Sequence, residues 1–427
     1  MKHSVLKKTG IFLSFMLAAS NAWSAEHRIT VTNTTSLERK DEQVVLTRTA
    51  IEKEIGQIPD GQFVTLYNGA NPVAVQFDDM DGDQRWDEVV FLYSFAPHEQ
   101  LVLKPTITQH PNLAKKQRAY VRQKHKNADD SFGAIVTTDT MPYQNSPTDF
   151  TVQALPPYLT EGPAWENDKV GFRIYFDTRN TKDIWGKTTD KMVLDFVGVD
   201  PKVIYHHLDW WGMDIFKVGS SLGAGSLALH IKLPDGKDSR VRLGEKNIDQ
   251  VTYRQISAGP LRAVFELQYK GWKVAENLPK VDLKEQISIW GGHYFYESKV
   301  QLDKCPSGSA LVTGYANFLS AGDHTYGSAD GSALYTDDLQ SENQDGLGLG
   351  IITQKARNVV MGRTRNDLTD VQNTSFVQIP AKPHKPIVFR FVSGWQKSDP
   401  MFETKKGFAD YVKTETQLFA APLQIFY

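Results

Sequence analysis

The sequence predicts a mostly β protein, with a small N-terminal β-sandwich domain, a larger antiparallel β-sandwich domain and one C-terminal helix. Short runs rich in β-branched and aromatic residues recur along the chain, and turn residues bound them. Helical periodicity is confined to residues 403–418, where Phe408, Tyr411 and Val412 share one stripe. Frequent strands without intervening helices favour antiparallel sheets packed face to face.

The first 24 residues are predicted to be a secretory signal peptide. Lys2, Lys7 and Lys8 precede a short apolar run at 11–19, and small residues follow before Ser24. The apolar run is shorter than the ~20 residues that a membrane-spanning helix needs, which disfavours a membrane anchor. We therefore expect cleavage near Ser24 and a periplasmic or secreted mature protein with no membrane partner.

The composition excludes several classes of protein. The 427-residue chain has 40% hydrophobic residues and a formal net charge of −2, so it lacks the basic excess of a nucleic-acid-binding protein. Its one cysteine, Cys305, excludes an internal disulfide. Cys305 lies in a Pro-Ser-Gly turn, where we favour a structural role over that of a nucleophile.

The mature chain divides into three parts. Residues 25–112 are predicted to form the small β domain, with strands at 63–67 and 88–95. Residues 113–130 are polar and basic; they form either a polyanion contact or a solvated connector, and we favour the connector because charge runs usually face water. Residues 131–427 are predicted to form the large domain that carries the site.

The large domain contains regularly spaced strand signals. One hairpin is predicted where the runs 227–233 and 240–243 flank a Pro-Asp-Gly turn. The other predicted strands are 170–177, 251–256, 261–269, 286–290, 294–302, 348–353 and 387–391.

An acidic loop in the small domain has the spacing of a calcium-binding loop. Its carboxylates occupy positions 1, 3, 5 and 9, so that one tight loop aims several hard oxygens at one ion. The loop departs from an EF-hand at position 6, where Gln84 replaces glycine, and at position 12, which is Val90. The loop is therefore either a structural Ca²⁺ site or an acidic β-turn, and its candidate ligands are Asp79, Asp81, Asp83 and Asp87.

The strand at 170–177 has one polar face. Alternation places Arg173 and Tyr175 opposite the apolar residues of the strand. On a concave sheet, such a face suits sugar hydroxyls, and Arg173 could hold a carboxylate through two hydrogen bonds. The alternative is a strand side that faces solvent.

The stretch from Tyr205 to Gly225 combines ionisable side chains with four glycines, which suits a tight loop at a cleft. If His207 and Asp209 are extended, they point to the same side and form an oriented imidazole that can move protons. Asp214 is a candidate second carboxylate, and Lys217 a candidate charge stabiliser. Plain packing, a transition-metal site and a phosphate loop are the alternatives, although the spacing matches neither a zinc signature nor a P-loop.

Aromatic and polar residues around these motifs are candidates for sugar binding, because an indole face stacks on ring C–H groups. The same residues are common in sandwich cores, which is the alternative. The predicted substrate contacts are Trp165, Trp185, Lys187, His206, Trp210 and Trp211, with Glu166 as a further catalytic carboxylate. His293, Tyr294, Tyr296 and Glu297 are reserve candidates for acid–base work.

In combination these motifs resemble the DUF4861 family of exported bacterial proteins. The resemblance rests on the stretches 161–167, 172–177, 183–187, 206–214 and 218–225. It implies a largely β protein similar to mutarotase-like and polysaccharide-lyase sandwich domains, of the supersandwich type. It also implies a link to the degradation of polysaccharides, notably those that contain uronates, but it supplies no established catalytic residue.

We therefore expect an exported carbohydrate-active enzyme that acts on acidic oligosaccharides and requires no cofactor, with a structural Ca²⁺ in the acidic loop as a possible addition. In a lyase, His207 would be the base, Tyr175 the acid, and Arg173 or Lys217 the partner of the uronate carboxylate. A glycosidase would instead use two carboxylates, Glu166 and Asp214. A glycan-binding protein without catalysis, and a mutarotase or epimerase, are the alternatives.

Overall fold

The computed structural model describes Met1 and residues 27–427, apart from 142–143, 234, 329, 355–357 and 365–369. The predicted signal peptide lies outside the described residues. The described chain is mostly β, with antiparallel sheets in a sandwich arrangement and two α-helices, which confirms the predicted fold class. Among the described helices, none has the length and apolar character to cross a membrane.

The N-terminal part packs a five-stranded sheet, in the order β29-β1-β7-β3-β4, near a three-stranded sheet, β2-β6-β5. One apolar cluster, which includes Val31, Leu46 and Phe91, joins strands of both sheets. The strands are β1 (Ile29–Thr32), β2 (Arg39–Thr47), β3 (Phe63–Asn68), β4 (Asn71–Pro72), β5 (Gln76–Asp78), β6 (Glu88–Phe95) and β7 (Gln100–Thr108).

Helix α1 (Arg48–Ile55) was not predicted. Thr47 caps its N-terminus by accepting a hydrogen bond from the backbone N–H of Ala50. Eight residues make barely two turns, and only Arg48 and Ile51 are buried, so the stretch carries too few apolar repeats to reveal a helical period.

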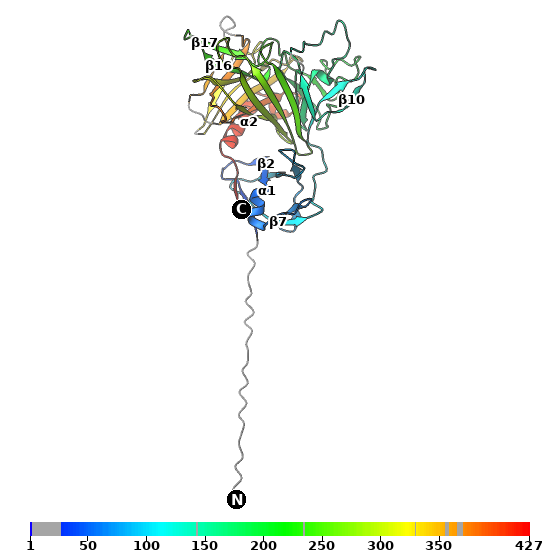
Figure 1. The fold of residues 1–427 in the computed structure, drawn as a ribbon, viewed down its shortest axis with the longest axis vertical. Coiled ribbons are helices and arrows are strands. Elements are labelled where there is room, and N and C mark those ends of the chain that lie inside the picture. The colour runs from blue at the N-terminus through cyan, green and yellow to red at the C-terminus, as the bar shows by residue number, and fades with distance from the viewer. Residues whose placement is uncertain (2–26, 142–143, 234, 329, 355–357, 365–369) are drawn as a thin grey trace.

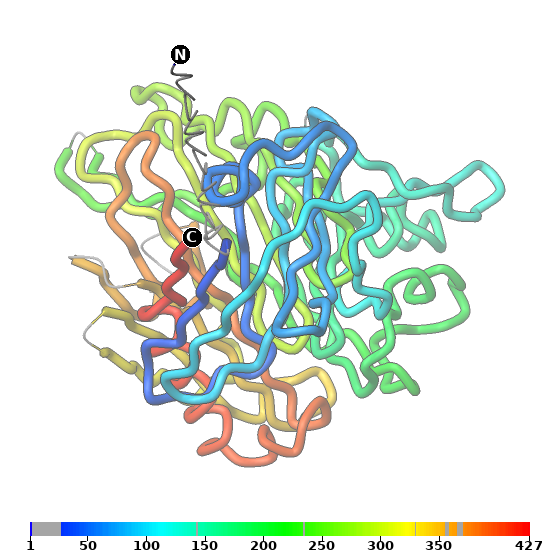
Figure 2. Tube along the Cα trace, turned by 90° about the horizontal axis from the view of Figure 1, so that it is seen from below, coloured from blue at the N-terminus to red at the C-terminus, as the bar shows by residue number. Residues whose placement is uncertain are grey.

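The C-terminus returns to the N-terminal part. Strand β29 (Gln424–Phe426) pairs antiparallel with β1, so the last residues complete the five-stranded sheet. Figures 1 and 2 show the C-terminus beside the first strands of the chain. The prediction that all residues after 130 belong to the large domain is therefore wrong for this last strand, because its partner lies almost 400 residues earlier and no local pattern marks it.

In the large domain, a nine-stranded sheet faces two five-stranded sheets across one apolar core. The nine-stranded sheet has the order β11-β18-β19-β20-β21-β28-β25-β24-β23. Its strands are β11 (Thr138–Met141), β18 (Gln250–Ala258), β19 (Arg262–Trp272), β20 (Val281–Trp290), β21 (Phe295–Leu302), β23 (His324–Gly327), β24 (Gly331–Leu339), β25 (Gly346–Gln354) and β28 (Ile387–Trp395). The predicted C-terminal helix is α2 (Lys405–Ala420), which packs on β24 and β25.

One five-stranded sheet has the order β17-β16-β22-β27-β26. Its strands are β16 (Ala224–Lys232), β17 (Asp238–Arg242), β22 (Ala310–Ala316), β26 (Val360–Arg363) and β27 (Thr374–Pro380). The predicted hairpin is the antiparallel pair β16 and β17. Strands β9 (Lys124–Lys126) and β10 (Phe132–Ile135) form a separate two-stranded sheet.

The other five-stranded sheet, in the order β15-β14-β13-β12-β8, positions the candidate site. Its strands are β8 (Ala119–Arg122), β12 (Ala164–Asn167), β13 (Val170–Ile174), β14 (Lys182–Lys187) and β15 (Gly212–Asp214). Phe172, Ile174 and Ile184 face the core, as their place in its apolar cluster shows. Alternation then places Arg173 and Asp183 on the outer face, directly opposite each other in the register.

Strand β8 corrects the prediction of a solvated connector at 113–130. Arg122 is fully buried and donates hydrogen bonds to the carbonyl oxygens of Leu159 and Leu194. Arg118 bridges the two parts of the chain through Asp41 and Asp168. These arginines are structural, so part of the basic run faces buried acceptors and not water.

Candidate functional site

A buried ionic cluster lies on the outer face of the sheet that contains β13 and β14. Arg173 Nη2 lies 2.8 Å from Asp183 Oδ2 and 2.6 Å from Asp214 Oδ2. Arg173 Nη1 lies 3.5 Å from Glu161 Oε2, and the Tyr175 hydroxyl donates to Asp183 at 2.6 Å. We call these five residues the Arg173 cluster; each is at most 8% exposed.

Three carboxylates around one guanidinium make the cluster rich in negative charge. Burial, reinforced by the nearby Asp183 charge, raises the pKa of Asp214 well above its ordinary value. Burial likewise raises the pKa of Tyr175. Arg173 is already enclosed by its own partners, so the prediction that it binds a substrate carboxylate is not supported by its surroundings.

The backbone beside the cluster is strained. Thr160 and Glu161 both adopt positive φ, 52° and 66°, which is rare for residues other than glycine. Gly162 follows with φ 153° against β13, where an added Cβ would lie 2.2 Å from the Ile174 carbonyl oxygen. Such strain persists only where the surrounding structure enforces it, and here it directs the Glu161 carboxylate toward Arg173 and Arg179.

Tyr205 and His206 connect the cluster to the surface. The Tyr205 hydroxyl accepts a 3.3 Å hydrogen bond from Arg173 Nη1, and His206 Nδ1 lies 3.4 Å from Asp214 Oδ2. The His206 side chain is 56% exposed. Partial burial and the Arg173 charge lower the pKa of His206, which favours the neutral imidazole at pH 7.

A cavity of about 370 Å³ opens beside these two residues. Thr160, Asp200, Tyr205 and His206 supply its polar side chains. The rest of its wall is largely apolar, as in many small-molecule sites, and includes Phe150, Ala154, Leu155, Pro156, Val203 and Ile204. The His206 imidazole therefore lines this cavity, whereas the Arg173 guanidinium does not.

The structure places the other ionisable residues of the predicted loop differently. His207, Asp209 and Lys217 are exposed, and Asp209 accepts a hydrogen bond from the backbone N–H of Trp210. Among the described side chains, no hydrogen bond or ion pair joins His207 to Asp209. The prediction that His207 pairs with Asp209 is therefore wrong, because the turn there places His206, and not His207, over Asp214.

Four predicted site residues are core residues. Trp165 and Trp185 are at most 1% exposed, so neither indole offers a face to a sugar. Lys187 Nζ lies 2.5 Å from Glu166 Oε2, and both side chains are fully buried. Glu166 Oε1 also accepts hydrogen bonds from two backbone N–H groups of the segment that covers the sheet, those of Val193 and Leu194. Their predicted contacts with substrate are therefore corrected to structural roles.

Trp210 and Trp211 differ from each other. Trp211 is 4% exposed and packs against Trp185 in a small apolar cluster, so it too is a core residue. Trp210 is 58% exposed, with Lys191 over its ring. Of the predicted indoles, only Trp210 is available to a ligand.

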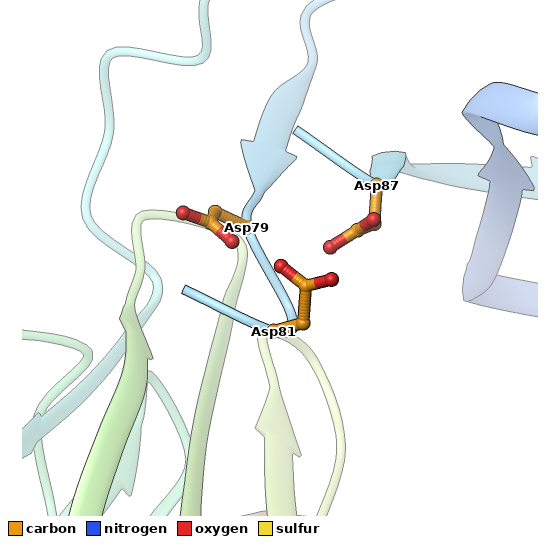
Figure 3. Close-up of side chains that lie close together, drawn as sticks. All are labelled: Asp79, Asp81 and Asp87. Carbon is orange, nitrogen blue, oxygen red and sulfur yellow. The ribbon is translucent and has the colours of Figure 1, made fainter. Parts of the chain in front are cut away.

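The acidic loop gathers three of its four predicted ligands. Oxygens of Asp79, Asp81 and Asp87 lie within 4.8 Å of one another. Figure 3 shows these three side chains close together. Asp83 stands outside the group and accepts a hydrogen bond from the backbone N–H of Arg85. Gln84 takes φ 70°, so it adopts the left-handed conformation that glycine usually supplies at this position. These three carboxylates are the residues that could hold a Ca²⁺ ion.

Sequence reasoning missed Glu161, Asp183 and Tyr205 as site residues. Asp183 faces Arg173 only through the pairing register of β13 and β14. Glu161 reaches Arg173 only because the preceding turn is left-handed. A buried arginine on a strand needs carboxylate partners, and that requirement was the available signal that acidic residues would gather around it.

Comparisons with known proteins find one family. The family model described as a domain of unknown function, DUF4861, matches residues 31–425. Uncharacterized protein P7 of Formosa agariphila is 22% identical over an alignment of 441 residues including gaps. The alignment covers 97% of this chain and 98% of that protein.

Solved structures give weaker likenesses. An alpha-mannosidase from Enterococcus faecalis V583 is 8% identical, with a TM-score of 0.43 over 94% of this chain and 46% of that one. This chain thus spans about half the length of that mannosidase. A putative aldose 1-epimerase from Klebsiella pneumoniae is 9% identical, with a TM-score of 0.31 over 70% of this chain and 97% of that one.

Proposed function

The chain belongs to the DUF4861 family, and we propose that it is an exported carbohydrate-active enzyme that acts on uronate-containing oligosaccharides. The observation that carries the proposal is the exposed imidazole of His206, which lies over the buried Asp214 carboxylate at the edge of a cavity. An imidazole held by a buried ion pair and open to a cavity is suited to general acid–base chemistry near neutral pH.

The proposed reaction is β-elimination at the bond to the uronate C4 oxygen. His206 takes the proton from C5, the electron pair left behind forms the C4–C5 double bond, and the C4–O bond breaks. Tyr205 gives its proton to the leaving oxygen. The Tyr205 hydroxyl accepts a hydrogen bond from Arg173, which leaves its own proton free to be donated, and burial raises its pKa so that it is protonated at neutral pH.

Elimination also needs a cation beside the uronate carboxylate, because negative charge develops there in the transition state. Arg173 is enclosed, so we assign this role to Arg179, which lies outside the cavity wall and would meet the carboxylate of a uronate that extends beyond the cavity. Its side chain is 33% exposed, and it lies over the Tyr175 ring while it pairs with Glu161 and Asp177. Arg179 is therefore the guanidinium of this network that reaches solvent.

A mutarotase or epimerase is the second candidate. Within the described part of the chain, the cavity beside His206 has no lysine or arginine in its wall, which favours a neutral sugar. Tyr205 and His206 would then exchange protons with the ring oxygen and the anomeric hydroxyl. A hydrolase is less well supported, because Glu166, one of its two required carboxylates, is sealed against Lys187.

Incubation with a panel of uronate oligosaccharides tests the proposal. A lyase produces an unsaturated sugar that absorbs in the ultraviolet, and we expect this product. New reducing ends without that absorbance would indicate hydrolysis, and exchange of anomers without cleavage would indicate a mutarotase. Binding without any of these changes would indicate a glycan-binding protein without catalysis, in which the exposed Trp210 would contact the sugar.

A further inference from the structure

A second cavity, of about 590 Å³, lies where the N-terminal sheets meet the large domain. It is bounded by β2, by the residues just before β21 and by α2. It shares no residue with the Arg173 cluster or with the cavity beside His206. Cavities between domains are frequent ligand sites, so we considered which groups this one presents.

One wall is aromatic and aliphatic. Tyr294 and Tyr411 line it together with Met401 and Leu418. Tyr294 is only 2% exposed and supports this wall from behind: its hydroxyl donates to Asp399 at 2.7 Å, and its backbone N–H donates to the Tyr411 hydroxyl at 3.0 Å, which holds the Tyr411 ring in place. A rigid wall of this kind suits the C–H groups of a sugar ring.

His293 presents a hydrogen-bond acceptor to the cavity. Its Nε2 lies 2.9 Å from the backbone oxygen of Asp41, which can only accept, so Nε2 carries the proton. In the neutral imidazole Nδ1 is then an acceptor, and no described residue hydrogen-bonds to it. Asp41 is itself held by two hydrogen bonds from Arg118, at 3.0 and 2.9 Å, so the imidazole is fixed in place.

Glu415 presents a second acceptor. It is 7% exposed, and its Oε2 accepts a hydrogen bond from Arg390 Nη1 at 3.2 Å. Its Oε1 has no hydrogen-bond partner among the described residues. A carboxylate oxygen left without a partner in so buried a place favours a ligand that donates to it.

The charge around this cavity disfavours an anionic ligand. Both groups without partners are acceptors, and acidic residues outnumber basic ones in the wall. The acidic residues are Glu38, Asp41, Glu42, Asp399 and Glu415, against Lys40 and Lys169. Asp41, Glu42 and Glu415 are each paired with an arginine, so the acceptors left open here favour a neutral ligand that donates hydrogen bonds over an anionic one.

We propose that this cavity is a second carbohydrate site, which binds a neutral pyranose unit. The ring lies against Tyr411 and Met401, and two hydroxyls donate to His293 Nδ1 and Glu415 Oε1. The proposal does not depend on the function assigned to the Tyr205–His206 cavity, because no residue is shared.

NMR of histidine side chains in the full-length mature protein tests the proposal, with D-glucose and D-galactose as neutral probes. D-Glucuronate and D-glucosamine are the charged probes. We expect a neutral sugar to shift the imidazole resonances of His293 saturably, and Glu415→Leu to weaken this binding about tenfold or more. His293→Phe should also abolish binding, followed through the backbone amide resonances of Gly292 and Tyr294 because this variant lacks the imidazole, and this keeps the test valid if Glu415→Leu fails to fold. His206→Ala should leave the sugar-induced shifts of His293 unchanged.

The other results would overturn the proposal. They are a response to glucuronate alone, a response to glucosamine alone, or no shift with either neutral sugar at hundred-millimolar concentration. Neutral-sugar binding that both cavity variants leave intact would place the sugar elsewhere and would overturn it equally. None of these outcomes bears on elimination at the Tyr205–His206 cavity, which is measured separately by its unsaturated product.

Discussion

Nδ1 of His206 lies 3.4 Å from Oδ2 of Asp214, the same oxygen that accepts a hydrogen bond from Arg173. One exposed imidazole is thereby placed by a fully buried ion pair. The arrangement separates the group that can meet a ligand from the groups that hold it, because Asp214 and Arg173 are at most 2% exposed. It also gives the chain a matched control, since the neighbouring His207 is exposed and outside this network.

His206→Ala should lower the rate of the proposed elimination by about 100-fold or more, the usual contribution of a general base. Its side chain is 56% exposed, so the melting temperature should change little. His207→Ala should retain most of the activity. Initial rates of product formation and thermal melts of both variants provide the measurement. Equal losses in the two variants, or a loss only in His207→Ala, would remove His206 from the mechanism.

The activity should persist below the ordinary pKa of histidine, about 6.5. A general base must be neutral to accept a proton, and partial burial and the Arg173 charge lower the pKa of His206. A lowered pKa moves the acid limb of the rate profile to lower pH, so half of the activity should be lost below pH ~6.5. The pH dependence of kcat/KM and an NMR titration of the His206 imidazole should give the same midpoint. A midpoint above the ordinary value would contradict the assignment.

The sequence predicted the fold class because strand periodicity and turn residues are local. It also predicted the polar face of β13, since alternation places Arg173 away from the core. It did not predict that this face is buried, because the segment 188–211 covers it through contacts that are distant in sequence. Glu166, for example, binds backbone N–H groups of Val193 and Leu194 more than 25 residues away.

The choice between two adjacent histidines lay beyond sequence reasoning for a similar reason. The extended conformation assumed for His207 and Asp209 would have paired them, but the chain turns there, and the backbone N–H of His207 donates to the oxygen of Ile204. A shift of one residue in a turn changes which side chain faces the sheet. Such a shift depends on how the loop packs on the sheet, where the ring of Tyr205 from the loop meets the ring of Trp185 edge to face at 5.3 Å.

A buried ion pair in the core offers a test of the sandwich itself. Lys182 Nζ lies 2.7 Å from Glu285 Oε1, and each side chain is 1% exposed. Lys182→Met should lower the free energy of unfolding by about 3–5 kcal/mol, because it leaves Glu285 as an unpaired buried charge. Lys182→Met combined with Glu285→Gln should recover most of that loss, as measured by urea unfolding. A double variant as unstable as the single one would show that the loss of stability arises from the changed shape of the side chain and not from the unpaired charge.

Two adjacent aspartates on β24 should respond oppositely to substitution. Burial raises the pKa of Asp337 to about 6, and its Oδ2 has no hydrogen-bond partner among the described atoms. A carboxyl whose pKa is raised on folding stabilises the fold below its unfolded pKa, and that stability is lost as the pH rises toward 6.

Asp337→Asn should therefore stabilise the protein at pH 8 by about 1 kcal/mol, after allowance for partial solvent screening. The gain should disappear at pH 4. Asp338 is the matched control: despite partial burial, hydrogen bonds from Lys405 and the Ala321 backbone N–H hold its pKa low, so Asp338→Asn should destabilise. Thermal melts at the two pH values distinguish the variants. Destabilisation by Asp337→Asn at pH 8 would mean that its carboxylate has a partner.

Millimolar Ca²⁺ should raise the melting temperature if the loop of Asp79, Asp81 and Asp87 binds the ion, because a ligand that binds only the folded state stabilises it. Asp87→Asn should abolish the increase, since it removes one of the three converging carboxylates. Asp83→Asn should keep it, because Asp83 lies outside the group. The loop lies in the N-terminal part, so the ion should leave sugar turnover by the Tyr205–His206 cavity unchanged. An unchanged melting temperature in Ca²⁺ would identify the loop as an acidic turn held by its own hydrogen bonds, such as those from Gly82 and Gln84 N–H to Asp79.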